Sequence, residues 1–430
     1  MDKIADDRIN YVNILLMFIT AGLAFFMPFE TFLIAYAFLG PLHYLTEISW
    51  LHDRQYFAKG KYDYVVLVII GVLLSFAAFS RDIGMNMDFY KYFVKMNLFD
   101  KLLVLAFFSS ILFALVKNLY IKLFAIVVVF IFVNGWFAPS RNDVNENSTT
   151  VFALTSLLPT LIHVYLFTGL FMLYGALKSR STSGLMSVGA FVALPIAIIF
   201  LAPVDPSGGF LSQYGMDAYW AGGEGFFTTN VSIMNHFDLA TPMMDNAKYL
   251  EVFVNDQSGF SAEMQQSVRD SLAPIADQPH IWKHAGLFPE YMNKTIPLEQ
   301  IAPYDKAGYI SSLKAGYWDV VFHSSAGIML MRFFAFAYLY HYLNWFSKTE
   351  VIKWHKIPKM RFVAIIALWL IACGLYAYDY AIGLNFLFFL SFSHVLLEFP
   401  LNVVSIVGIG KESMSIFNHG FKRKEEVASH

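Results

Sequence analysis

The chain has 430 residues, of which 57% are hydrophobic and only 14% are charged. About a quarter of the residues are charged in soluble domains, so this composition excludes an ordinary soluble domain and is typical of a polytopic membrane protein. The formal net charge of −2 offers no basic surface for a nucleic acid, and the single cysteine, Cys373, excludes an intramolecular disulfide bond. We therefore expect an all-α integral membrane protein.

The predicted elements are apolar stretches long enough to cross a bilayer as helices, which takes about 20 residues each. The segment MPFE between the first two stretches is so short that it predicts a tight helical hairpin. In chain order the ten predicted spans are residues 11–27, 29–51, 63–80, 100–116, 119–137, 151–176, 185–203, 317–346, 360–379 and 381–408.

A polar stretch rich in Gly, Asp and Asn interrupts this series after the seventh span. We interpret 1–203 as transmembrane helices one to seven, 204–316 as an extracytoplasmic soluble insert, 317–410 as transmembrane helices eight to ten, and 411–430 as a cytoplasmic tail. Within the insert, the sequence SAEMQQSVRDSLAPIA predicts an amphipathic helix.

Lysine and arginine are concentrated in the connections on one side of the predicted membrane. Examples are Arg54, Lys59 and Lys61 after the second span, and the run from Lys348 to Arg361 before the ninth. Cytoplasmic loops carry such an excess of positive charge. We therefore expect a multi-pass protein of a bacterial inner membrane, with both termini in the cytoplasm.

Two of the predicted spans contain a histidine followed four residues later by a glutamate. The pairs are His43 with Glu47, and His394 with Glu398. At helical geometry the two members of a pair lie on one face, about 6 Å apart along the axis. Each ionisable side chain inside a bilayer is unfavourable by roughly 2.5–3.5 kcal/mol, so four of them indicate a buried polar site.

Two more histidines, on two further spans, fall at a similar depth in the membrane. His163 lies near the middle of its span, and His341 lies deeper on the cytoplasmic side. Four separate spans thus bring His or Glu into the inner half of the bilayer. The predicted ligand set is His43, Glu47, His163, His341, His394 and Glu398.

This set of residue types is the chemistry of a metal centre. Neutral imidazole and ionised carboxylate are ligands of non-haem iron, manganese and zinc, and a divalent ion compensates buried carboxylates. We expect non-haem iron, as one ion or two, with zinc and manganese as alternatives. Tyr44, Asn344 and Asn402 lie near the ligands in sequence and are candidates to hydrogen-bond to them.

Other interpretations need no metal at this place. Arg332, near mid-membrane, could neutralise Glu398 or Glu47 as a buried ion pair, and the histidines could form a polar pathway or a hydrogen-bonded network. Separately, His280 and His284 in the insert have a spacing that would allow a zinc site.

The first functional hypothesis is a membrane-embedded, metal-dependent oxidoreductase or oxygenase acting on a long apolar substrate, a lipid or a carotenoid. Iron held by His and Glu with an open coordination position can activate O₂. Phe-rich helices would admit the hydrocarbon from the bilayer. Its partners would be membrane lipids and the apolar substrate, with no nucleic acid, and homo-oligomer formation is left open.

The residues GPLH, Gly40 to His43, resemble the intramembrane Gly-Pro-His segment of the Brp/Blh β-carotene-cleaving oxygenases. That family is polytopic and uses histidines on several helices to hold iron, so the resemblance implies oxidative carotenoid cleavage. This chain departs from the family in its length, its outer insert and the glutamates beside its histidines.

Two further hypotheses use the same buried groups. A proton-coupled transporter or carrier would use the intramembrane His, Glu and Arg as a proton relay. A haem b electron-transfer protein would use His163, His341 or His394 as axial ligands, and its haem would be non-covalent because the chain has no C-x-x-C-H motif.

Overall fold

The structure is a computed structural model, and it describes residues 3–54, 59–60, 62–82, 98–136, 153–204, 209–222, 233–234, 236–237, 261–276 and 321–421. Within these ranges the regular secondary structure is helical, with no β-strand. The all-α prediction is therefore confirmed.

The first half of the chain forms helices α1 to α7, with one π-helical segment, η1, placed directly before α3. Their bounds are α1 Lys3–Phe26, α2 Pro28–Ile34, η1 Ala35–Leu39, α3 Gly40–Arg54, α4 Asp63–Asp82, α6 Leu98–Leu115 and α7 Leu119–Trp136.

The remaining helices include two more π-helical segments and a C-terminal helix of 40 residues. They are η2 Ala153–Phe167, α9 Thr168–Ser179, α10 Thr182–Ile196, η3 Ala197–Leu201, α11 Gln213–Gly222, α14 Ala262–Ala276, α17 Ser325–Ser347, α18 Thr349–Ile352, α19 Lys359–Tyr378 and α20 Tyr380–His419.

Within the described residues, each predicted span overlaps one helix or consecutive helical segments. Five described helices are long and apolar enough to cross a membrane: Asp7–Phe26, Leu157–Ser179, Thr182–Leu201, Lys359–Tyr378 and Tyr380–His419. The chain is therefore a membrane protein by composition and helix length, whereas ten crossings and the placement of both termini in the cytoplasm stay predictions.

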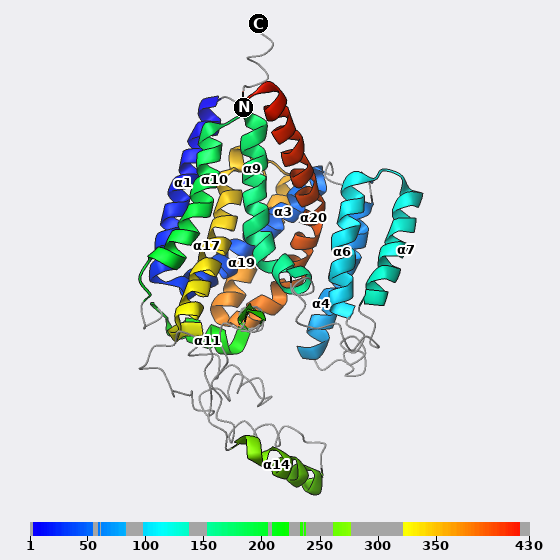
Figure 1. The fold of residues 1–430 in the computed structure, drawn as a ribbon, viewed down its shortest axis with the longest axis vertical. Helices are drawn as coiled ribbons and strands as arrows, with labels where there is room; N and C mark the ends of the chain where they lie inside the picture. The colour runs from blue at the N-terminus through cyan, green and yellow to red at the C-terminus, as the bar shows by residue number, and fades with distance from the viewer. Residues whose placement is uncertain are drawn as a thin grey trace.

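The predicted insert and tail are described only in part. The amphipathic helix predicted in the insert is present as α14, which lies apart from the main bundle in Figure 1. The predicted tail, 411–430, begins inside α20, which continues nine residues further, to His419. No helix-breaking residue occurs there before Gly420, whose φ of +75° ends the helix.

Helices α17 and α20 occupy the middle of the bundle. Helix α20 packs against α3, α4, α6, α9 and α19, while α17 packs against α1, α2, η1 and η2 (Figure 1). Helices α4, α6 and α7 form a layer on one flank. This arrangement places the inward faces of α3, η2, α17 and α20 around a common interior.

Candidate metal centre

The two His–Glu pairs lie on helices α3 and α20, on faces that point into the bundle. His43 and Glu47 come from α3, and His394 and Glu398 come from α20. All four side chains are 1–3% exposed. The spacing of four residues puts both members of each pair on the same side of their helix, as the sequence predicts.

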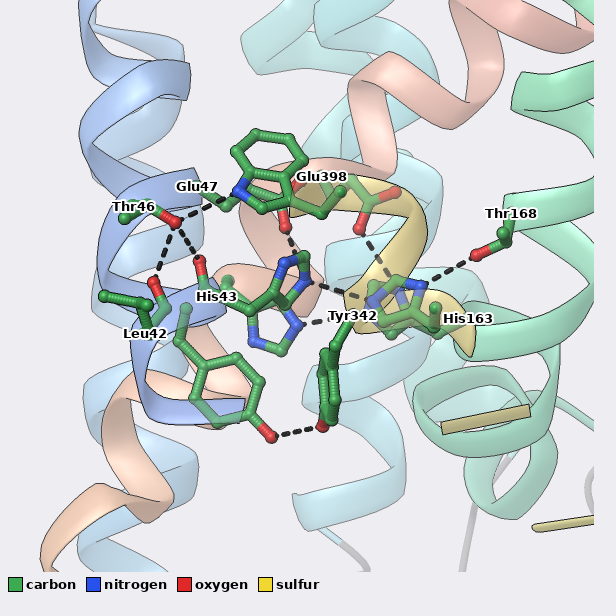
Figure 2. Close-up of polar contacts among 12 residues, drawn as sticks. Leu42, His43, Thr46, Glu47, His163, Thr168, Tyr342 and Glu398 are labelled. Carbon is green, nitrogen blue, oxygen red and sulfur yellow. Dashed lines mark hydrogen bonds and ion pairs between the residues drawn. The ribbon is translucent and has the colours of Figure 1, made fainter. Parts of the chain in front are cut away.

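The other two predicted ligands approach from α17 and η2. His341 Nε2 lies 3.0 Å from His43 Nε2, and His163 Nε2 lies 3.1 Å from His394 Nε2. The structure thus brings all six predicted ligands, from four elements far apart in sequence, into one buried group (Figure 2). Whether they bind metal stays a prediction.

Three of the histidines form the tightest set of donor atoms. One ring nitrogen each from His43, His341 and His394 lies within 4.8 Å of the others, and all three side chains are buried. Donor atoms on opposite sides of one ion with bonds of about 2.1 Å are separated by roughly 4.2 Å. The three nitrogens are therefore close enough together to hold one metal ion after a small adjustment.

Each contact between two imidazole rings requires a proton on one ring and a lone pair on the other. In both contacts, His341 with His43 and His163 with His394, at least one nitrogen therefore carries a lone pair directed into the group. A metal ion can accept several such lone pairs simultaneously, and it requires no proton between the rings.

A threonine that sequence reasoning did not single out fixes the orientation of His341. The hydroxyl of Thr168, which is 2% exposed, lies 2.7 Å from His341 Nδ1. This hydrogen bond leaves His341 Nε2 facing His43, 3.0 Å from the Nε2 atom of that ring. Ligand histidines in metal sites are oriented in this way by a partner on the second ring nitrogen.

The glutamates contact histidine nitrogens without forming aligned hydrogen bonds. Glu47 Oε2 lies 2.9 Å from His43 Nε2, and Glu398 Oε2 lies 3.3 Å from His163 Nδ1. Among the described residues neither carboxylate oxygen has a hydrogen-bond partner. In each pair, therefore, the ring N–H direction and the carboxylate oxygen are not aligned as in a hydrogen bond. Two donors at about 2.1 Å from one ion, at a right angle, are about 3.0 Å apart, which matches the Glu47 contact.

Aromatic side chains pack around the histidine group. The ring of Tyr44 stacks on His394 with centroids 4.3 Å apart, and its hydroxyl lies 2.8 Å from the hydroxyl of Tyr342. Trp345 packs edge-on against His43 at 5.4 Å and donates its indole N–H to Thr46. Of the predicted neighbours of the ligands, Tyr44 therefore contacts a ligand directly.

The other two predicted neighbours, Asn344 and Asn402, are buried at 9% and 3% exposure. Within the described part of the chain, Asn344 Oδ1 and both amide atoms of Asn402 have no hydrogen-bond partner. Buried amides normally make hydrogen bonds, so these atoms are available to a ligand, an ion or water. Asn402 lies one helical turn beyond Glu398 on α20.

The prediction that Arg332 neutralises a buried glutamate needs correction. Its guanidinium donates to the carbonyls of Ile198 and Pro203, at 3.2 and 2.8 Å, and lies over the ring of Phe25. In the described ranges the ion pairs of both glutamates are with histidines. Arg332 is nine residues, about 13.5 Å, from His341 along α17 and on the opposite face.

The buried group contains four of the described histidines, which are His43, His163, His341 and His394. His280 and His284, which have the spacing of a zinc site, lie outside the described residues. His52, at the end of α3, is exposed and contacts Asp53. The four histidines of the buried group are therefore the four that the sequence predicts to lie near or below the middle of the membrane.

No protein-family model, curated protein or solved structure matches this chain. The resemblance of the Gly40–His43 segment to the Brp/Blh oxygenases is thus left untested.

Proposed function

We propose that the chain is a membrane-embedded, non-haem iron oxygenase acting on a long apolar substrate. The observation that carries the proposal is the set of buried imidazole nitrogens from His43, His341 and His394, within 4.8 Å of one another and next to Glu47. Histidines with a carboxylate and open positions are the ligands of non-haem iron enzymes that use O₂.

The ligands of the proposed ion divide the work as follows. His43, His341 and His394 supply neutral nitrogen donors, and Glu47 supplies an oxygen and one negative charge. Bound iron would supply the activation of O₂. The chain itself excludes water, because all four side chains are buried.

The aromatic side of the group suits a hydrocarbon substrate. Tyr44 and Tyr342 belong to a hydrophobic cluster that also contains Phe32, Phe334 and Tyr338, contributed by α2, α3 and α17. A long apolar molecule would approach the ion from this side. A carotenoid or lipid from the bilayer has the required chemistry, and the GPLH segment favours a carotenoid.

We further propose that the protein crosses a bacterial inner membrane ten times with both termini in the cytoplasm. The coincidence of the ten predicted spans with helical segments and the distribution of Lys and Arg in the short connections support this arrangement.

The test is the metal content of the full chain purified in detergent, together with its optical spectrum. We expect stoichiometric iron without a Soret band, and loss of that iron in His43→Ala and in His394→Ala. The matched control is His52→Ala, on the same helix as His43 but exposed, which should retain the metal.

Three results would overturn the proposal. A Soret band would favour the haem hypothesis. Absence of bound metal in protein produced in an iron-supplemented medium would favour the carrier hypothesis. Iron retained by both alanine variants would place the ion elsewhere.

A further inference from the structure

We propose that the buried group holds a second divalent cation, bound by Glu398 Oε2 and His163 Nδ1. The inference rests on the proposed metal centre and assigns donors that the first ion does not use. The proposed first ion takes His43, His341 and His394 together with Glu47, and neither His163 nor Glu398 is among these donors.

The first argument is the position of His163, whose two ring nitrogens face different groups. Nε2 lies 3.1 Å from Nε2 of His394, one of the three histidines of the proposed first site, and Nδ1 lies 3.3 Å from Glu398 Oε2. The ring therefore stands between the proposed first ion and the carboxylate. It can offer a donor to a second ion without leaving the first group.

The second argument is the geometry of the contact between Glu398 and His163. In the described chain neither Glu398 Oε2 nor His163 Nδ1 has a hydrogen-bond partner, although the two atoms are only 3.3 Å apart. Two donors of one ion with bonds of about 2.1 Å lie roughly 3.0 to 3.4 Å apart, depending on the angle at the ion. The separation fits two donors directed at a common cation.

The third argument is that further oxygen donors lie beside this pair. Asn402, one turn along α20 from Glu398, is 3% exposed, and its amide oxygen has no hydrogen-bond partner among the described residues. The carboxylates of Glu47 and Glu398 interact electrostatically, and Figure 2 shows both on the same side of the histidine group. Glu47 could thus contribute its second oxygen as a bridge between the ions.

The chemical class of the second ligand follows from these donors. One imidazole nitrogen, one or two carboxylate oxygens and an amide oxygen favour Fe(II), Mn(II) or Zn(II) over the soft ions that thiolates bind. Two divalent ions against two carboxylates leave a net positive charge, which favours a hydroxide between the ions.

The experiment counts ions in the full-length protein and asks whether they are coupled. Metal-free protein in detergent is loaded with Mn(II) under anaerobic conditions, and bound manganese is measured by mass spectrometry and by electron paramagnetic resonance. We expect two ions per chain and the spectrum of a spin-coupled pair. Glu398→Gln, which keeps the shape and removes the charge, should retain one uncoupled ion.

The matched control is Glu412→Gln, on the same helix, whose carboxylate pairs with Arg180 away from the buried group. This variant should keep both ions. One uncoupled ion in both the unmodified protein and Glu398→Gln would overturn the second site and leave the proposed function standing. Loss of both ions in Glu398→Gln would also overturn it, because Glu398 would then support the first ion. No ion in the unmodified protein would overturn both.

Discussion

At the scale of single residues, the hydroxyl of Thr168 determines which ring nitrogen of His341 faces the other buried histidines. The hydrogen bond to His341 Nδ1 is 2.7 Å long and wholly buried. Without it the ring could turn about its Cβ–Cγ bond, and Nε2 would lose its fixed direction. A partner of this kind typically changes metal affinity by 10- to 100-fold.

Replacing Thr168 with valine should therefore weaken metal binding by about tenfold or more while leaving the fold intact. The measurement is competition with a chelator, alongside a thermal melt. Thr160→Val is the matched control, because the Thr160 hydroxyl, on η2, contacts the carbonyl of Leu157. Unchanged affinity in Thr168→Val would show that His341 is not a ligand or is oriented otherwise.

Arg332 hydrogen-bonds to backbone carbonyls at the end of η3 and does not pair with the buried glutamates. Its guanidinium satisfies the carbonyls of Ile198 and Pro203, which the helix end leaves without partners of its own. Hydrogen bonds to a charged group contribute about 1.5–3 kcal/mol each.

We expect Arg332→Met to lower the melting temperature in detergent while keeping the metal stoichiometry of the unmodified protein. Loss of those two hydrogen bonds, with burial of the freed carbonyls, is the physical reason. Loss of metal in a variant that still melts cooperatively would contradict this account, and would restore Arg332 as the charge partner of a glutamate.

At the scale of elements, π-helical segments occur at two of the four elements that carry the predicted ligands. Segment η1 ends directly before α3, which carries His43, and η2 itself carries His163. A π-helix widens the turn, and such segments are frequent at functional sites. Pro159, inside η2, lacks the N–H of a regular helix and favours this departure.

Gly40 allows the close approach of two tyrosines at the start of α3. A Cβ atom at this position would lie 2.9 Å from the Tyr44 hydroxyl and 3.3 Å from that of Tyr342. Because Tyr44 stacks on His394, a shift of the Tyr44 ring would also displace His394 in the buried histidine group.

Gly40→Ala should therefore destabilise the protein by about 1–3 kcal/mol through overpacking. Thermal melts of metal-free and metal-loaded protein provide the measurement. The control is Gly22→Ala on α1, where an added Cβ would meet nothing within 4 Å, and where alanine should be neutral or slightly stabilising. Equal melting temperatures for the two variants would show that Tyr44 can move freely.

At the scale of the whole molecule, an even number of crossings puts both ends of the chain on one side. A fluorescent reporter attached at either terminus should fluoresce in the cytoplasm, and alkaline phosphatase inserted within 204–316 should be active outside it. Reporters that place the two termini on opposite sides would contradict the ten-span arrangement.

Much of the fold and the proximity of the six predicted ligands could be predicted from the sequence. The apolar stretches gave the helices, and the spacing of four residues placed His43 with Glu47 and His394 with Glu398. Membrane depth then added His163 and His341. Depth alone does not tell which way a side chain points around its helix.

That limit accounts for the failures. Arg332 has a suitable depth, but nine residues correspond to about two and a half turns of α17, which turns it away from His341. Thr168 was missed because its hydroxyl contacts His341 on α17, 173 residues further along the chain, and no local spacing in the sequence indicates such a contact.

The six clustered side chains come from α3 near the beginning of the chain, from η2 between the two ends, and from α17 and α20 near the end. During synthesis, therefore, the side chains of the proposed metal site come together only after the last long helix has been made and has entered the bundle. An ion at this site would be bound after translation of α20. It would link the first helices to the last and stabilise the assembled protein.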